Sequence, residues 1–311
     1  FFSINANNTV LSEDYLFEKL KNRDEIQINL SGNNYVRFLK QIQVVGKKNN
    51  LINNSLINTS KKRWIRSRIK FENEDIPVRI KLHGNNSDHI SIPYSSLNIK
   101  KTFDKFDRLN LLRPDTRNNE AEIFGTVFLE NFKIIVPDTK YINLKINKHD
   151  PEQFLLQEKI DDKLLKRRDL KNGPILKFSD KDEKIYEAKK IQKDRISFFE
   201  IYENANDEFI KNTDNSLITY KAIGLMNNKS LFNNYYNYKF QALISILDGC
   251  HALSGNDPIF YYDVISNNFY HVYYDGMFFN QNNSNYFCEE LRFIIDPKFK
   301  NRFINEFNEK L

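Results

Sequence analysis

The chain has 311 residues, 40% of them hydrophobic and 28% charged, so it can bury the core of one large domain or of two ordinary ones. No window approaches the roughly 18 consecutive apolar residues that a spanning helix needs, which argues against an integral membrane protein. The formal net charge of +6 is compatible with anionic partners. The densest basic clusters, at 61–68 and 163–168, are expected to form solvated faces.

Cysteine and histidine are sparse, and their spacing does not predict a zinc site. Cys250 and Cys288 form no CxxC motif, and the five histidines are dispersed without a metal-binding spacing. The two cysteines either form one disulfide in an oxidising compartment or remain buried thiols. Because the sequence starts at Phe1 without a methionine, we expect a fragment or a processed chain.

Residues 1–60 are predicted to form an N-terminal extension or an accessory subdomain. A short helix is expected to end near Lys21, and residues 25–30 alternate like a strand. The Asn-rich stretch 47–58 is polar and turn-prone, so it is expected to be a linker or a long loop.

Residues 61–178 are predicted to form a strand-rich lobe. Alternation of apolar and polar residues predicts a hairpin over 63–71 and 77–82, followed by strands at 96–101, 140–146, 152–157 and 175–178. Apolar residues at helical spacing predict a helix over 117–131, and 161–168 also has a helical pattern.

Residues 179–311 are predicted to form a helix-rich lobe around one hairpin. Helical or mixed segments are expected at 181–193, 197–206, 216–226, 232–247 and 301–311, and the hairpin strands at 259–265 and 268–274. The predicted fold class is therefore α+β with two lobes, and a nucleotide cleft is expected between them.

The stretch 248–277 contains the strongest chemical signal of the sequence. Asp248, the pair Asn256 and Asp257, and Asp275 follow one another in an order that phosphoryl-transfer enzymes use for a catalytic carboxylate and for magnesium ligands. The predicted hairpin would bring Asp257 and Asp275 toward each other. The alternative interpretation is a surface loop with ordinary solvated acids.

Several motifs occur in a recognisable order along the chain. They are VRIKLHGNNSDH (78–89), SSLNIK (95–100), RPDTRNNEAEIF (113–124), FLLQEKID (154–161), NGPILKF (172–178), LDGCHALSGNDPIFYYDV (247–264) and YYDGM (273–277). With these motifs, over about residues 62–280, the chain resembles the CotH (spore coat protein H) family of atypical kinases. The resemblance implies a divergent protein-kinase-like two-lobed fold that binds ATP with Mg²⁺, or with Mn²⁺ in its place.

The resemblance also implies roles for residues of the strand-rich lobe. Gly84, Asn85 and Ser87 match a turn over the phosphates, which suits an anion because a glycine turn exposes backbone N–H groups. Lys100 matches a strand lysine that reaches the phosphates, and Glu122 is its expected partner. Glu120 is the alternative partner, since one helical position decides which acid faces the lysine.

Further positions match the nucleotide and metal contacts of the family. Gln157 and Glu158 resemble a hinge that would meet the adenine, and Lys177 is a second candidate for phosphate contact. Asp248 matches the catalytic-loop aspartate that orients or deprotonates the acceptor hydroxyl. His251 is expected to support that loop by hydrogen bonding.

The metal ligands are expected near the predicted hairpin. Asn256 and Asp257 compete for the first metal position, and Asp275 matches the second. Family members end this motif with two acids one residue apart, whereas Gly276 and Met277 follow Asp275 here. An inactive pseudokinase is therefore a second possibility.

The resemblance predicts a kinase that transfers the γ-phosphoryl group of ATP to a hydroxyl, either of a protein Ser/Thr or of an envelope glycan or lipid acceptor. It favours a bacterial cell-envelope or secreted location and leaves a cytoplasmic one open. The alternative to catalysis is a pseudokinase or a polyanion- or protein-binding module of the cell envelope. No motif for sequence-specific nucleic-acid recognition is present.

Overall fold

The computed structural model describes residues 15–46, 59–104, 107–178, 202–204, 209–226, 228–253, 257–279 and 297–310. The chain divides into two compact units. Unit 1 consists of Phe1–Thr116 and Asp138–Lys159, and unit 2 of Arg117–Pro137 and Ile160–Leu311. These units differ from the predicted parts 1–60, 61–178 and 179–311, because residues 117–137 and 160–178 belong with the C-terminal residues.

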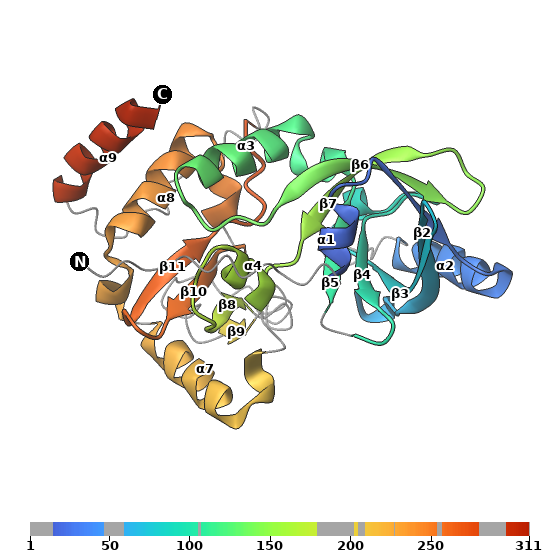
Figure 1. Ribbon diagram of the computed structural model, residues 1–311, viewed down its shortest axis with the longest axis horizontal. Helices are drawn as coiled ribbons and strands as arrows, with labels where there is room; N and C mark the ends of the chain where they lie inside the picture. The colour runs from blue at the N-terminus through green and yellow to red at the C-terminus, as the bar shows by residue number, and fades with distance from the viewer. Residues whose placement is uncertain are drawn as a thin grey trace, which may run out of the picture. The chain divides into compact units, whose positions relative to one another are not determined.

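Unit 1 is built on a closed barrel. In the described residues its strands are β1 (Glu25–Asn29), β2 (Ile65–Phe71), β3 (Glu74–Leu82), β4 (Leu97–Lys101), β5 (Arg108–Leu112), β6 (Thr139–Ile146) and β7 (Glu152–Glu158). They follow the order β1-β2-β3-β4-β5-β7-β6 around the barrel. Figure 1 labels β2 to β7. Neighbours pair antiparallel except β1 and β6, whose parallel pairing closes the barrel.

The barrel core follows from the alternation of apolar and polar residues along its strands. In β2, Ile65, Ile69 and Phe71 are buried, whereas Arg66 and Arg68 are exposed. The helices α1 (Leu16–Leu20) and α2 (Gly32–Val45) add apolar side chains to the same core. Short 3₁₀ helices occur at η1 (Thr59–Lys61), η2 (Ser87–His89) and η3 (Pro114–Arg117).

A buried carboxylate ties α1 to the barrel. Both oxygens of Asp107 accept hydrogen bonds from the backbone N–H of Leu16, at 3.1 and 2.9 Å. The Lys101 ammonium lies 2.9 Å from the same carboxylate. Asp107 thus satisfies an N–H group at the first turn of α1 that has no partner within the helix.

Unit 2 combines a small antiparallel sheet with helices. The sheet has the order β11-β10-β8-β9, formed by β8 (Ile175–Phe178), β9 (Tyr202–Asn204), β10 (Ile259–Asp263) and β11 (Asn268–Val272). The α-helices are α3 (Glu120–Asn131), α4 (Asp162–Arg167), α7 (Thr213–Leu225), α8 (Tyr235–Ile246) and α9 (Pro297–Lys310). The 3₁₀ helices are η4 (Phe209–Lys211), η5 (Lys229–Phe232) and η6 (Cys250–Leu253). Apolar side chains of α3, α8 and α9 share one core cluster.

The predicted α+β, protein-kinase-like two-lobed fold is wrong. The structure has a closed seven-stranded mixed barrel in its described residues, together with a separate small sheet and helices. The strand β1, which was assigned to an extension, is an integral member of the barrel because it pairs with both β2 and β6. A closed barrel has no edge strand, so it is a different architecture from the expected strand-rich lobe.

Most of the predicted individual elements are present. Both predicted hairpins are confirmed, as β2 with β3 and as β10 with β11. The sequence patterns did not predict α2 or β5, and β9 is a strand where a helical or mixed segment was expected. The predicted linker 47–58 and the segment 181–193 lie outside the described residues. Among the helices that the structure describes, none is both long and apolar enough to cross a membrane.

Candidate metal centre

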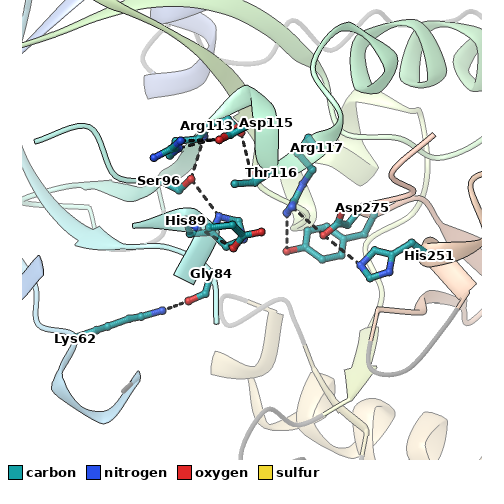
Figure 2. A network of polar contacts seen from close by, with 12 residues as sticks. Lys62, Gly84, His89, Ser96, Arg113, Asp115, Thr116, Arg117, His251 and Asp275 are labelled. Carbon is teal, nitrogen blue, oxygen red and sulfur yellow. Dashed lines mark hydrogen bonds and ion pairs between the residues drawn. The ribbon is translucent and has the colours of Figure 1, made fainter. Parts of the chain in front are cut away.

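Three side chains of unit 2 converge where a metal ion could be held. His251, Asp257 and Asp275 each present a ligand atom within 4.8 Å of the others. The His251 Nε2 atom lies 3.2 Å from Asp257 Oδ2 and 3.8 Å from Asp275 Oδ2. Figure 2 shows the His251 ring directed at the Asp275 carboxylate. The predicted approach of Asp257 and Asp275 is therefore confirmed.

The β10–β11 hairpin positions the two carboxylates. Ile259, at the start of β10, pairs with Val272, at the end of β11. Asp257 precedes the first strand by two residues, and Asp275 follows the second by three, so both lie at the same end of the ladder. His251 reaches them from η6, the 3₁₀ turn that follows α8.

A buried arginine holds Asp275 in place. Arg117 is only 2% exposed, and its guanidinium lies 2.8 Å from Asp275 Oδ2 and 3.4 Å from the Tyr274 hydroxyl. Figure 2 shows this pair beside His251. Burial alone lowers the pKa of Arg117, but the charge of Asp275 raises it, and the net shift is upward. Arg117 therefore stays charged and stabilises the Asp275 carboxylate.

The other oxygen of Asp275 gives the clearest indication of a ligand. Asp275 Oδ1 is buried and has no hydrogen-bond partner among the described residues. A buried acceptor without a partner costs about 1–3 kcal/mol. Asp275 also has a φ of 49°, a left-handed conformation that is uncommon outside glycine and is found at functional sites. A divalent cation would satisfy the oxygen, so the residues present fit a metal ion.

The loop that carries Asp275 is fixed by aromatic packing on both sides. The Tyr273 hydroxyl donates a 2.6 Å hydrogen bond to Glu122 Oε2 and accepts one of 2.9 Å from the Gly276 N–H. Burial and the Glu122 carboxylate raise the pKa of Tyr273 well above its ordinary value, so the phenol stays protonated. The Tyr273 ring stacks on Phe278 with a centroid distance of 5.0 Å.

Glycines leave room for the aromatic rings of this loop because they carry no Cβ atom. A Cβ atom at Gly125, in α3, would lie 2.0 Å from the Phe278 ring, and one at Gly249 would lie 2.7 Å from it. A Cβ at Gly276 would lie 2.9 Å from the Tyr273 ring. Three glycines from separate segments thus allow the loop to pack between α3 and the end of α8.

The remaining predicted residues of this motif lie in different settings. Asn256, the competing metal ligand, lies outside the described residues. Asp248 is exposed on the turn after α8, with a φ of 50°, and is not part of the three-residue cluster. His251 was expected to support the loop, whereas the structure places it among the candidate ligands. The spacing of His251 and Asp257 gave no motif, so only the three-dimensional arrangement shows this role.

The predicted lysine–glutamate pair belongs to two different units. Glu122 is fully buried in unit 2, where it accepts the Tyr273 hydrogen bond. Lys100 lies on β4 in unit 1, with its ammonium 4.2 Å from the centroid of the Trp64 ring. The pairing of Lys100 with Glu122 therefore stays a prediction.

The predicted phosphate turn has a structural explanation of its own. Gly84 has a φ of 76°, and a Cβ there would lie 2.0 Å from the His89 ring, so only glycine fits. Its carbonyl accepts a hydrogen bond from the Lys62 ammonium. Asn85 is half-buried and Ser87 is exposed at the start of η2. A role for these residues in phosphate binding stays a prediction.

The predicted hinge and second phosphate contact are ordered parts of their sheets. Gln157 is buried and its amide donates to Thr139 Oγ1 at 3.3 Å. Glu158 is buried and accepts from the Asp138 N–H at 3.1 Å. Lys177 is half-buried on β8, where it pairs with Ile259 of β10. Contacts of these residues with a nucleotide also stay predictions.

Cys250, which directly precedes His251, is disulfide-bonded. The other cysteine of the sequence, Cys288, lies outside the described residues.

Comparisons of the chain with protein-family models and with curated proteins gave no match. The resemblance to the CotH family accordingly stays a prediction.

Proposed function

We propose that the chain is a metal-dependent phosphotransferase that moves the γ-phosphoryl group of ATP to a hydroxyl of a protein or cell-envelope acceptor. The observation that carries this proposal is the convergence of His251, Asp257 and Asp275, with one buried Asp275 oxygen that has no hydrogen-bond partner among the described residues. The proposal rests on these donor atoms and the order of the acidic residues, not on the fold.

The donor set favours manganese over magnesium. Carboxylate oxygens suit Mg²⁺ and Mn²⁺, whereas an imidazole nitrogen suits later transition metals and is a poor ligand for Mg²⁺. A site of one imidazole and two carboxylates therefore fits Mn²⁺ best among the cations that support phosphoryl transfer. When bound, such an ion supplies positive charge for phosphate oxygens.

The residues of the chain have distinct roles in this proposal. His251, Asp257 and Asp275 hold the ion, and Arg117 fixes the orientation of Asp275. Asp248 is exposed and is not among the three ligands, so it can accept the proton of the acceptor hydroxyl.

Metal titration by calorimetry tests the site directly. Asp275→Asn and His251→Gln should each weaken Mn²⁺ binding at least tenfold, because the first removes a carboxylate charge and the second removes the imidazole nitrogen. Asp214→Asn is the matched control, since Asp214 is an exposed carboxylate of unit 2 in the first turn of α7. Equal Mn²⁺ affinity in all the variants would refute the site.

Transfer of labelled phosphate from ATP separates an active enzyme from a pseudokinase. Incorporation into a hydroxyl acceptor should require Mn²⁺, and Asp248→Asn should abolish it while leaving Mn²⁺ binding unchanged. If ATP binds with Mn²⁺ and no phosphate is transferred to the protein itself or to added acceptors, the chain is a pseudokinase and the proposed turnover is wrong.

A further inference from the structure

A basic groove of about 760 Å³ lies on unit 1, separate from the residues of the metal centre. Six of its lining residues are cations, and no acidic residue lines it; the cations are Arg37, Lys40, Lys61, Arg63, Arg66 and Arg79. The remaining lining residues include Asn34, Gln41 and Trp64. Six cations and no acid around one groove suit a polyanion.

Local structure explains why these cations share one surface. Arg37, Lys40 and Val44 follow one another at spacings of three and four on α2, so they lie on one face of the helix. Arg66 on β2 and Arg79 on β3 point out of the barrel, because their neighbours in both strands are buried.

The strand register extends the positive charge beyond the groove. Arg66 pairs with Arg79, Arg79 with Lys100, and Lys100 with Arg108, across the four strands β2 to β5. Adjacent strands lie about 4.8 Å apart, so this cationic row is roughly 14 Å long. Like charges directly opposite one another destabilise a sheet, and a bound anion would remove that repulsion.

Several of these cations have no acidic partner among the described residues. Arg66 and Arg79 form no ion pair with a described acid, whereas Arg68, also on β2, is paired with Asp75 at 2.7 Å. The Nε atom of Arg79 is buried without a hydrogen-bond partner in the part of the chain that the structure describes.

A buried amide gives a second indication of a ligand. Gln41 is 9% exposed and its oxygen accepts from the Arg63 N–H, but its Nε2 is buried and has no hydrogen-bond partner among the described residues. Donors without partners in a cationic groove suit phosphate oxygens or nucleobase acceptors.

We infer that this groove binds a single-stranded nucleic acid without sequence specificity. The cationic row continues past the groove, which suits an extended chain of phosphates better than one nucleotide. A base would stack on Trp64 in the lining by displacing the Lys100 ammonium, which lies 4.2 Å from the centroid of the ring; a sulfated glycan or a lipid headgroup has no base. A duplex hides the faces of its bases, so a flexible single strand fits the groove better.

Trp64 is the only tryptophan of the sequence, so its fluorescence reports on the groove alone. A single-stranded oligonucleotide longer than one site of roughly 4–16 nucleotides should quench it, in buffer with a chelator as well as with metal. Persistence of binding with a chelator distinguishes this groove from the proposed metal centre. Quenching by heparin or by anionic vesicles of equal charge, with none by the oligonucleotide, would overturn the assignment.

Variants that remove positive charges test which arginines of the groove bind the oligonucleotide. The triple variant Arg37→Ala, Arg66→Ala, Arg79→Ala should weaken oligonucleotide binding at least tenfold and lower the slope of log affinity against log salt by about 2, since each lost phosphate contact contributes roughly 0.7 for single strands. The control Arg68→Ala changes an exposed arginine of the same strand that Asp75 already pairs. Affinity is measured by the fluorescence anisotropy of a labelled oligonucleotide. Equal losses of affinity in the triple variant and the control would refute the groove as the binding site.

Discussion

At the scale of single residues, Asp275 is the group on which the candidate metal centre depends. One of its oxygens is held by Arg117 and the other is buried without a described partner. The sequence indicated Asp257 and Asp275 because their order in the chain is typical of phosphoryl-transfer enzymes. It did not indicate His251 as a candidate ligand, because no spacing rule connects a histidine on a 3₁₀ turn with the acids that flank a hairpin.

Replacement of the buried Arg117 should lower the stability of the metal-free protein. Arg117→Met leaves Asp275 as an uncompensated buried charge, so the free energy of unfolding should fall by about 3–5 kcal/mol. Added Mn²⁺ should recover part of this loss, because it supplies the missing positive charge. Urea denaturation with and without Mn²⁺ measures both effects.

The control for that variant is Arg113→Met. Arg113 pairs with Asp115 at 2.6 Å, but its side chain is 27% exposed and its partner 53% exposed. Such surface pairs contribute about 1 kcal/mol or less. A loss as large for Arg113→Met as for Arg117→Met would contradict the role of burial.

His271 should make unit 2 sensitive to acid. Burial lowers its pKa from 6.5 to about 3, and its ring stacks on Phe240. Between these pH values the unfolded state binds the proton and the folded state does not, so stability falls as the pH drops below 6.5. The expected loss is about 1.4 kcal/mol per pH unit, or about 2 kcal/mol at pH 5.

Stability measured against pH in two variants checks this prediction. His271→Phe should remove most of the slope between pH 6.5 and pH 4. His149→Gln should not, because His149 is exposed. An unchanged slope in His271→Phe would contradict the assignment of the acid sensitivity to His271.

At the scale of elements, α3 and the loop after β11 depend on each other. Phe278 fills the space that Gly125 leaves open on α3, and the same loop carries Asp275. The sequence predicted α3 from its apolar spacing, and the structure begins it at Glu120 after the 3₁₀ turn η3. It could not show why glycine stands at position 125, because the ring that requires it comes from a segment more than a hundred residues later.

Two glycine-to-alanine variants separate helix propensity from packing. Gly125→Ala puts a Cβ into the Phe278 ring, so it should lower the free energy of unfolding by about 1–3 kcal/mol and weaken Mn²⁺ binding. Gly224→Ala, in α7, meets nothing within 4 Å and should raise stability by up to about 1 kcal/mol. Thermal unfolding of both variants gives the comparison, and a stabilised Gly125→Ala would contradict the packing described.

At the scale of the whole molecule, local patterns predicted the hairpins but not the barrel. The β2–β3 and β10–β11 hairpins follow from alternation and turn residues that are adjacent in the sequence. Closure of the barrel depends on parallel pairing of β1 with β6, where Ile26 lies opposite Leu144. No local pattern encodes a pairing over such a separation.

The path of the chain between the two units helps to explain why the fold prediction was wrong. The chain leaves unit 1 after Thr116, returns at Asp138 and leaves again after Lys159. A division of the sequence into a first and a second lobe cannot reproduce this path. The approach of Asp257 and Asp275 was predicted correctly, because the residues that flank the two strands of one hairpin come together through local structure alone.

Electron paramagnetic resonance of bound Mn²⁺ tests the metal centre most directly. Mn²⁺ added to the protein should show hyperfine coupling to one imidazole nitrogen, and His251→Gln should lose that coupling while His271→Phe keeps it. Bound Mn²⁺ without any nitrogen coupling, or with coupling that survives in His251→Gln, would contradict a centre built from His251, Asp257 and Asp275.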